Sequence, residues 1–339
     1  MESEQVFKKI LVPTDGSLQS LVAQELAAFM AKKLSSKVTV LHIVAHELMI
    51  SPERHRHVPV GGGAIQRHVP ASPATPLPEA VASEIINWYH QKGSKAIAEA
   101  VALFKEEGVP VDQKLVEHAD PAETIIKEAQ KGNYDVIVIG RSGEEEQEPH
   151  LGSVAEKVSR HAKTPVLVAG EKRQISKILV PVDGSENAEK ALQQAALLAK
   201  KTDAKITLLY VQESGLFDLR PKVTKEIGDR ILSSAANQVE GIKVDKKLES
   251  GDPAKTIIQT ANKGEYDIIV MGSRGLGAIR RFLLGSVSDH VIHYTNRSVL
   301  IVHTQPKKHA LKEEISIGKM ARHSGGHLPQ ADRRYGVKL

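Results

Sequence analysis

The chain contains one internal duplication, and this feature limits its fold more than any other. Residues 9–17 read KILVPTDGS and residues 177–185 read KILVPVDGS, an offset of 168. Residues 120–126 match residues 252–258 at an offset of 132, so the first copy holds 168 − 132 = 36 additional residues between the two matches. A long period that is repeated only twice predicts two similar domains in tandem and excludes a solenoid.

Both halves alternate apolar runs rich in valine and isoleucine, which indicate strands, with segments of helical period. Because strands that are apolar throughout must be covered on both faces, the sheet should be parallel with right-handed crossovers. We therefore expect an α/β fold of two doubly wound, Rossmann-like domains in tandem, each with a five-stranded parallel sheet. The expected strands are 10–13, 38–44, 111–117, 135–140 and 165–169 in the first half, and 178–181, 205–211, 243–248, 267–272 and 298–303 in the second; the first-half helices are expected at 20–34, 84–107, 122–131 and 154–163.

The length of 339 residues fits two domains of ordinary size and some additional segments. We place the first domain at 1–171, with an insertion at about 46–83, and the second at 172–305. Residues 304–339 contain eight Lys/Arg and three Asp/Glu, so this tail carries the whole net charge of +5. Its glycines and scattered charges predict a disordered, solvated tail at 306–339. Nucleic acid is therefore an unlikely partner, and a contact of the tail with nucleic acid or a membrane is the alternative.

The composition favours a reducing compartment. The sequence contains no cysteine, which excludes disulfides and thiol chemistry. No apolar run approaches 18 residues and the start of the chain is polar, so we expect neither a membrane span nor a signal peptide. These features predict a cytoplasmic protein.

The second half carries a glycine motif directly after an apolar run. The motif reads Gly272-Ser273-Arg274-Gly275, then nine residues, then Gly285-Ser286. Glycines allow backbone N–H groups to approach a phosphate, and the helix that begins at Ser286 favours an anion at its N-terminus. Asp183 ends the first strand of the same half, and ligands of such sheets bind beyond the carboxyl ends of the strands. The pattern predicts a nucleotide site; glycine turns without a ligand are the alternative.

This pattern resembles the universal stress protein family, here as two such domains in tandem. The resemblance covers about residues 6–45 and 83–170 in the first half and 175–304 in the second. It implies strand order 3-2-1-4-5 in each domain, with ATP bound between the first and fourth strands. It also implies a pseudo-twofold pair through the fifth strands, with residues 166–169 beside residues 299–303.

The resemblance also assigns residues to the second site. Pro181, Val182 and Asp183 would hold adenine together with Val211, and the glycine motif would surround ribose and phosphates. The residues implied for ATP binding are Pro181, Val182, Asp183, Val211, Met271, Gly272, Arg274, Gly275, Gly285, Ser286 and Val287. Mg²⁺ beside the ATP stays open, as does an adenine nucleotide other than ATP, such as cyclic AMP.

The first half retains an altered copy of the motif. Its arginine is one place early, at Arg141, and its spacer has eight residues instead of nine. That spacer contains the acidic run 144–148, whose carboxylates would repel a triphosphate. We expect a solvated loop and weak or absent nucleotide binding here; a metal that bridges the run to phosphate is the alternative. The residues of this degenerate site are Pro13, Thr14, Asp15, Val44, Gly140, Gly143, Gly152, Ser153 and Val154.

The insertion is rich in proline, glycine and histidine, which predicts a surface loop without regular structure. A flap near the first site and a partner-binding loop both stay open. His55, His57 and His68 could hold a metal, but a segment without cysteine makes this the less favoured interpretation. No metal site is therefore expected.

Catalysis is not the expected role. The chain has no Walker sequence, and Asp183 has no second carboxylate or lysine beside it in the motif set. We expect an ATP-binding stress-response or signalling module that acts through an unknown protein partner, with a homo-oligomer left open. A slow ATPase and an interaction scaffold with vestigial sites are the alternatives.

Overall fold

The computed structural model describes residues 7–44, 79–117, 120–143, 151–213, 221–239, 241–275 and 284–303. The acidic run 144–148, the expected tail, the three insertion histidines and most of the insertion lie outside these residues. No described helix is long and apolar enough to cross a lipid bilayer. Within the same ranges, no three His, Asp or Glu side chains form a group that could hold a metal ion.

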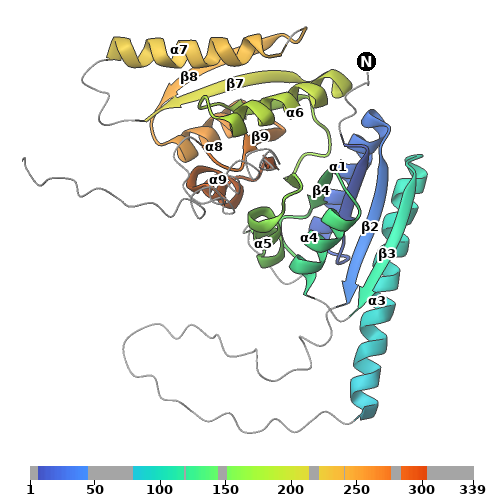
Figure 1. The fold of residues 1–339 in the computed structure, drawn as a ribbon. Helices are drawn as coiled ribbons and strands as arrows, with labels where there is room; N and C mark the ends of the chain where they lie inside the picture. Colours follow the sequence, from blue (N-terminus) through green and yellow to red (C-terminus); the bar gives the residue numbers. More distant parts are fainter. Residues whose placement is uncertain are drawn as a thin grey trace, which may run out of the picture. The chain divides into compact units, whose positions relative to one another are not determined.

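Strands and helices alternate in the order that the sequence predicts (Figure 1). The first half comprises β1 (Lys9–Pro13), α1 (Leu18–Leu34), β2 (Lys37–Val44), α3 (Glu79–Glu106), β3 (Val111–Glu117), α4 (Pro121–Lys131), β4 (Val136–Ile139), α5 (Ser153–His161) and β5 (Val166–Val168). The second half comprises β6 (Lys177–Pro181), α6 (Glu186–Thr202), β7 (Lys205–Gln212), α7 (Pro221–Asn237), β8 (Val244–Ser250), α8 (Pro253–Lys263), β9 (Ile268–Gly272), α9 (Ser286–Tyr294) and β10 (Ser298–Val302). Most expected boundaries differ from these by at most two residues, and the largest difference is that α3 begins at Glu79 rather than at 84, because helix-forming residues continue back to Pro78.

The strands form one sheet of ten, in the order β3-β2-β1-β4-β5-β10-β9-β6-β7-β8. Each half therefore has strand order 3-2-1-4-5, which confirms the expected fold. Among the described strands, β5 and β10 are the one antiparallel pair, with Leu167 opposite Leu300. The two halves thus pair through their fifth strands, as the family resemblance implies, and β3 and β8 form the outer edges of the sheet.

Helices α4 and α8 begin where the Asp-Pro signals predict. The Asp120 side chain accepts a hydrogen bond from the Glu123 N–H, and Asp252 does the same for Lys255. In both cases proline follows at the first helical position, where its missing N–H costs nothing. These two caps fix α4 and α8 beside the sheet in equivalent positions of the two halves.

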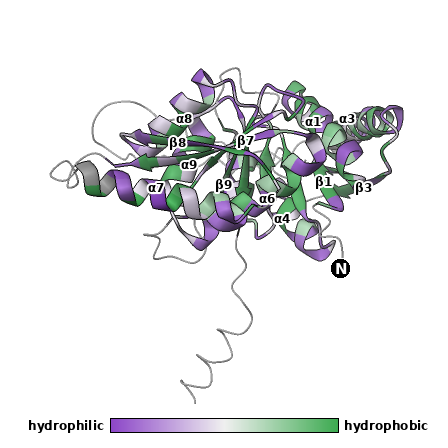
Figure 2. Ribbon diagram, turned by 90° about the horizontal axis from the view of Figure 1, so that it is seen from above, coloured by the Kyte–Doolittle hydropathy of each residue, from purple (hydrophilic) through white to green (hydrophobic). Residues whose placement is uncertain are grey.

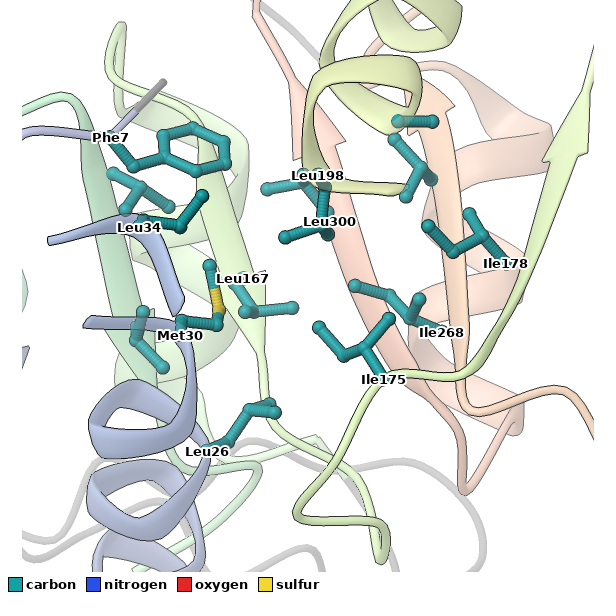
Figure 3. Packing of buried hydrophobic residues seen from close by; sticks show 14 of the residues in the cluster. Phe7, Leu26, Met30, Leu34, Leu167, Ile175, Ile178, Leu198, Ile268 and Leu300 are labelled. Carbon is teal, nitrogen blue, oxygen red and sulfur yellow. The ribbon is translucent and has the colours of Figure 1, made fainter. Parts of the chain in front are cut away.

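Two apolar cores cover the two faces of the sheet, and each runs through both halves. One core packs α1, α3, α6 and α7 against the sheet, and the other packs α4, α5, α8 and α9. Figure 3 shows Leu167 of β5 between two groups of side chains. Met30 and Leu34 of α1 lie on one side of it, and Leu300 and Leu198 of the second half lie on the other. In Figure 2 the strands around β1 and β9 are mostly green and the helices carry purple segments, as expected for central strands that are covered on both faces.

Candidate functional site

The carboxylate of Asp183 is held at the carboxyl end of β6. Val182 donates its N–H to the Leu209 carbonyl (2.9 Å), which extends the pairing with β7 by one residue beyond Pro181. Asp183 follows, and its Oδ1 accepts a hydrogen bond from the Ser185 N–H at 2.9 Å. This turn leads into α6 and fixes the carboxylate at the sheet edge where ligands of doubly wound domains bind.

The glycines of the β9 motif lie against this carboxylate and against α6. A Cβ added to Gly275 would be 2.5 Å from Asp183 Oδ2, and one added to Gly272 would be 2.8 Å from the backbone carbon of Asn187. A side chain at Gly272 would meet the backbone of α6, and one at Gly275 would displace the carboxylate of Asp183. The glycine motif that follows β9 therefore packs against the turn at Asp183, although the two segments are about 90 residues apart in sequence.

The start of α9 joins the same place. Gly285 donates its N–H to the Ser273 carbonyl (2.8 Å), and Ser288 donates its hydroxyl to the Gly272 carbonyl (2.8 Å). The N-cap is glycine, so no side chain caps the helix and its first N–H groups can serve an anion. Residues 276–283 of the spacer lie outside the described residues.

Every second-half residue that the resemblance implies lies in this region. Each is within three residues of the carboxyl end of β6, β7 or β9, or in the first turn and N-cap of α9. Sequence reasoning missed Tyr210 of β7: burial, and then the negative charge of Asp183, raise the pKa of its phenol. Only its position next to Val211 could have indicated it.

The first half repeats the same backbone arrangement. Thr14 donates its N–H to the Leu41 carbonyl (2.9 Å), and Asp15 Oδ1 accepts from the Ser17 N–H (3.0 Å). A Cβ added to Gly143 would lie 3.0 Å from Asp15 Oδ2. The remaining predicted residues end β1, β2 and β4 or open α5: Pro13, Val44, Gly140, Gly152, Ser153 and Val154.

The two sites differ in the side chains around the residue that precedes the aspartate, which is Thr14 in the first half and Val182 in the second. In the first half, Gln24 donates to the Thr14 hydroxyl (2.9 Å), and His42 Nδ1 bonds the Thr14 carbonyl (2.8 Å). Burial lowers the pKa of His42, against its bond to Thr14 and the charge of Asp15, and so favours the neutral ring. At the offset of 168 the second half has Val182, Leu192 and Tyr210 in place of Thr14, Gln24 and His42, so its site is the more apolar.

The displaced arginine of the first half leaves its own site. The side chain of Arg141 is buried and donates to two carbonyls of the second half, those of Ile292 (2.6 Å) and Arg297 (3.3 Å). Desolvation lowers the pKa of Arg141 to about 10, although the nearby charge of Glu171 opposes the shift. The one-residue shift seen in the sequence therefore turns this cation toward the contact between the halves.

Comparison with known proteins agrees with this architecture. The chain matches the model of the universal stress protein family over residues 7–53, 67–170 and 174–303. Universal stress protein Slr1230 of Synechocystis is 26% identical over 308 residues, which cover 86% of this chain and 99% of that protein. Universal stress protein MJ0531 of Methanocaldococcus jannaschii is 34% identical over 143 residues, 39% of this chain and 84% of that protein. The crystal structure of a universal stress protein from Archaeoglobus fulgidus has the same fold, with a TM-score of 0.61 and 24% identity over 87% of this chain and 98% of that one.

Proposed function

Because the chain belongs to the universal stress protein family, we propose that its second half binds an adenine nucleotide, with ATP as the first candidate, at the carboxyl ends of β6 and β9. The observation that carries the proposal is the contact of Asp183 with Gly275, where an added Cβ would lie 2.5 Å from the carboxylate. A cradle in which a fixed carboxylate, two glycines and an uncapped helix start meet has acceptor and donor groups for adenine and phosphate.

Each part of the proposed site has a chemical role. Asp183 accepts a hydrogen bond from the adenine amine, while Val182 and Val211 contact the base. The backbone around Gly272, Gly275 and Gly285 donates N–H groups to phosphate oxygens, and Arg274 adds a positive charge. Ser286 and Val287 contribute the N-terminal end of α9, whose dipole favours an anion.

The first half contributes less to nucleotide binding in this proposal. It keeps the Asp15 and Gly143 contact, but Arg141 bonds the second half instead of the cradle. Its spacer sequence adds four carboxylates, which disfavour a triphosphate. The protein would then act as a nucleotide-dependent stress-response or signalling module whose output passes to a protein partner.

Calorimetry of the full chain with ATP, with and without Mg²⁺, tests this function. We expect one nucleotide per chain, and Asp183→Ala should weaken binding by about 1–3 kcal/mol because the adenine amine loses its acceptor. Asp15→Ala is the matched control in the first half and should leave the affinity unchanged. Equal losses in both variants would overturn the assignment to the second half, and no binding by the wild type would favour a scaffold with vestigial sites. Phosphate release that Asp183→Ala abolishes would favour a slow ATPase.

A further inference from the structure

The contact between the halves, which we call the joint, has approximate twofold symmetry about Leu167 and Leu300. In the antiparallel pairing Val168 lies opposite Val299, and Val166 lies opposite Ile301. The twofold symmetry relates Val168 to Ile301 and Leu167 to Leu300. Equivalent residues of the two halves therefore differ in number by 301 − 168 = 133. Positions where the residues differ at this offset show how the two sides of the joint are distinguished.

The clearest difference is at position 170, which is glycine in the first half. A Cβ on Gly170 would lie 2.4 Å from three backbone atoms of the second half, in Asn296, Arg297 and Ser298. The Gly170 N–H also donates to the Ser298 hydroxyl at 3.0 Å, which holds the two segments at this distance. The counterpart at 170 + 133 = 303 is His303, a large side chain whose ring interacts with the backbone of Ser159 in the first half.

A second difference compensates for the first. Arg141 bonds the Ile292 carbonyl near the end of α9, and the counterpart of Ile292 is 292 − 133 = 159, the α5 residue whose backbone interacts with His303. The position that corresponds to Arg141 at the offset of 132 is Ser273, which is buried but short. Each helix end thus interacts with one large side chain from the opposite half, but the side chain comes from a different position on each side of the joint.

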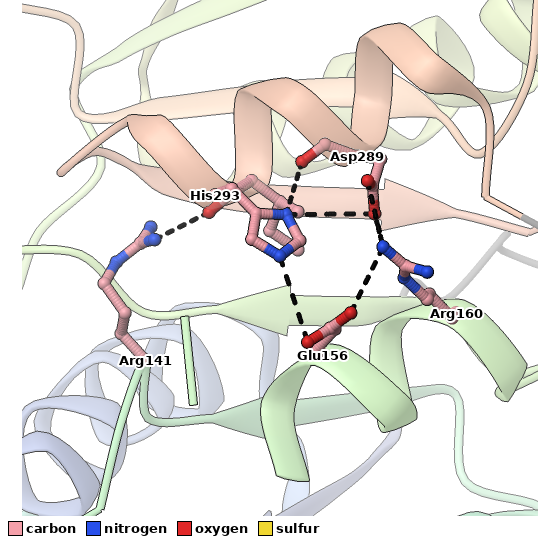
Figure 4. A network of polar contacts seen from close by, with 6 residues as sticks. Arg141, Glu156, Arg160, Asp289 and His293 are labelled. Carbon is pink, nitrogen blue, oxygen red and sulfur yellow. Dashed lines mark hydrogen bonds and ion pairs between the residues drawn. The ribbon is translucent and has the colours of Figure 1, made fainter. Parts of the chain in front are cut away.

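The facing helices α5 and α9 repeat this pattern with charges (Figure 4). Arg160 contacts Asp289 at 2.8 Å, and its counterpart His293 lies 4.0 Å from Glu156. Each helix has an acid followed four residues later by a base, yet only the base of the first half is permanently charged. Two second halves placed together would have no arginine in this network.

We infer that the joint is selective: the β10 surface of the second half accepts a first half and excludes the second half of another copy of this chain. In a pair of second halves, His303 would take the place of Gly170 against residues 296–298, where even a Cβ has no room. The same pair would have Ser273 in place of Arg141, so the Ile292 carbonyl in α9 and the Arg297 carbonyl before β10 would both lose the bond that Arg141 makes. A pair of second halves joined through β10 is therefore disfavoured both by the steric clash of His303 and by the loss of the Arg141 hydrogen bonds.

Cysteine cross-linking in the full chain tests the steric part, because the natural sequence contains no cysteine. Leu167 and Leu300 face each other across the joint, and facing residues of antiparallel strands lie within reach of a disulfide. Under mild oxidation, Leu167→Cys/Leu300→Cys should link within one chain. Adding Gly170→Ala should slow this linkage by about tenfold or more, as expected for an overpacked contact, whereas His303→Ala should not. Linkage at the parent rate with Gly170→Ala would overturn the inference.

Cross-linking between chains tests the exclusion itself. Chains with Leu300→Cys alone are unfolded, refolded together at high concentration and oxidised, and the dimers joined through position 300 are measured. We expect very few dimers, and several-fold more when His303→Gly is added, since that change removes the side chain that would collide. Equal dimer yields in the two variants, whether high or nil, would overturn the inference. Circular dichroism of each variant confirms that the compared chains have refolded.

Discussion

The two glycines that begin and end the first part of the β9 motif exclude side chains for different physical reasons. Gly272 has the backbone of Asn187 in α6 as its neighbour, whereas the neighbour of Gly275 among the described residues is the carboxylate of Asp183. Backbone in a helix cannot move aside cheaply, but a carboxylate can rotate away. The same substitution at the two positions should therefore affect different properties.

Gly272→Ala should lower the free energy of unfolding by about 1–3 kcal/mol, because a methyl group would overpack α6 against β9. Gly275→Ala should leave stability nearly unchanged but weaken ATP binding by about 1–3 kcal/mol, because Asp183 is displaced from its position. Urea unfolding and calorimetry on both variants measure these effects. Gly143→Ala, the matched first-half change, should not alter ATP affinity; wild-type binding by Gly275→Ala would contradict the role given to this contact.

His303 should make stability depend on pH. Burial, and then the positive charge of Arg274, lower the pKa of His303 to about 4 from 6.5. Because the unfolded chain binds this proton more readily, stability should fall as the pH decreases from 6.5 towards 4, by on the order of 2 kcal/mol between pH 7 and pH 5. His303→Gln should reduce this loss in urea unfolding at the two pH values. An unchanged pH dependence in the variant would show that other groups cause it.

At the residue scale the sequence predicts part of the site. The spacing of the motif and the position of Asp183 at a strand end were enough to bring Gly275 and Asp183 to one edge of the sheet. The destination of Arg141 could not be predicted, because it depends on which side of the loop faces the other half. The bonds of Gln24 and His42 to Thr14 were also missed, since each residue reads as an ordinary position of its own helix or strand.

At the scale of elements, α5 and α9 form a helix pair whose charged residues alternate in sign across the joint. Arg160 is placed between Asp289 at 2.8 Å and Glu156 at 3.1 Å, and all three side chains are about one-third exposed. Solvent at this exposure screens the charges, so the pair should contribute modestly.

A double-mutant cycle with Arg160→Met and Asp289→Asn should give a coupling free energy of about 0.3–1 kcal/mol from urea unfolding, decreasing at high salt. Lys127 and Glu123, an exposed pair within α4, provide the control cycle, with a coupling at the lower end of this range. A coupling above that range would mean that the joint excludes water from this network.

Element order, strand order and the caps of α4 and α8 were all predictable from periodicity, the Asp-Pro signals and the family resemblance. The early start of α3 was not, because the proline-rich segment before it hides the point at which the helical period begins. The boundaries given for the two domains, the insertion and the tail stay predictions.

For the whole molecule, both apolar cores extend through the joint, and Leu167 and Leu300 belong to the same cluster as residues of α1 and α6. The two halves should therefore unfold as one cooperative unit. Hydrogen exchange should give the most protected amides of β1 and β6 the same opening free energy, and Gly170→Ala should lower both together. Separate values in the wild type would mean that the halves are independent.

The position of β5 and β10 at the centre of the sheet has a consequence for aggregation. Two separate five-stranded sheets would have four free edges with unpaired backbone groups, but in the sheet of ten that the described strands form, the edges are β3 and β8. Both of these strands carry exposed charges, Asp112 and Lys114 in one and Asp245, Lys246 and Lys247 in the other. Charged edge strands resist the addition of a further strand. The duplication has thus buried the two apolar edges inside the protein and left to solvent the two that are poor templates for fibril growth.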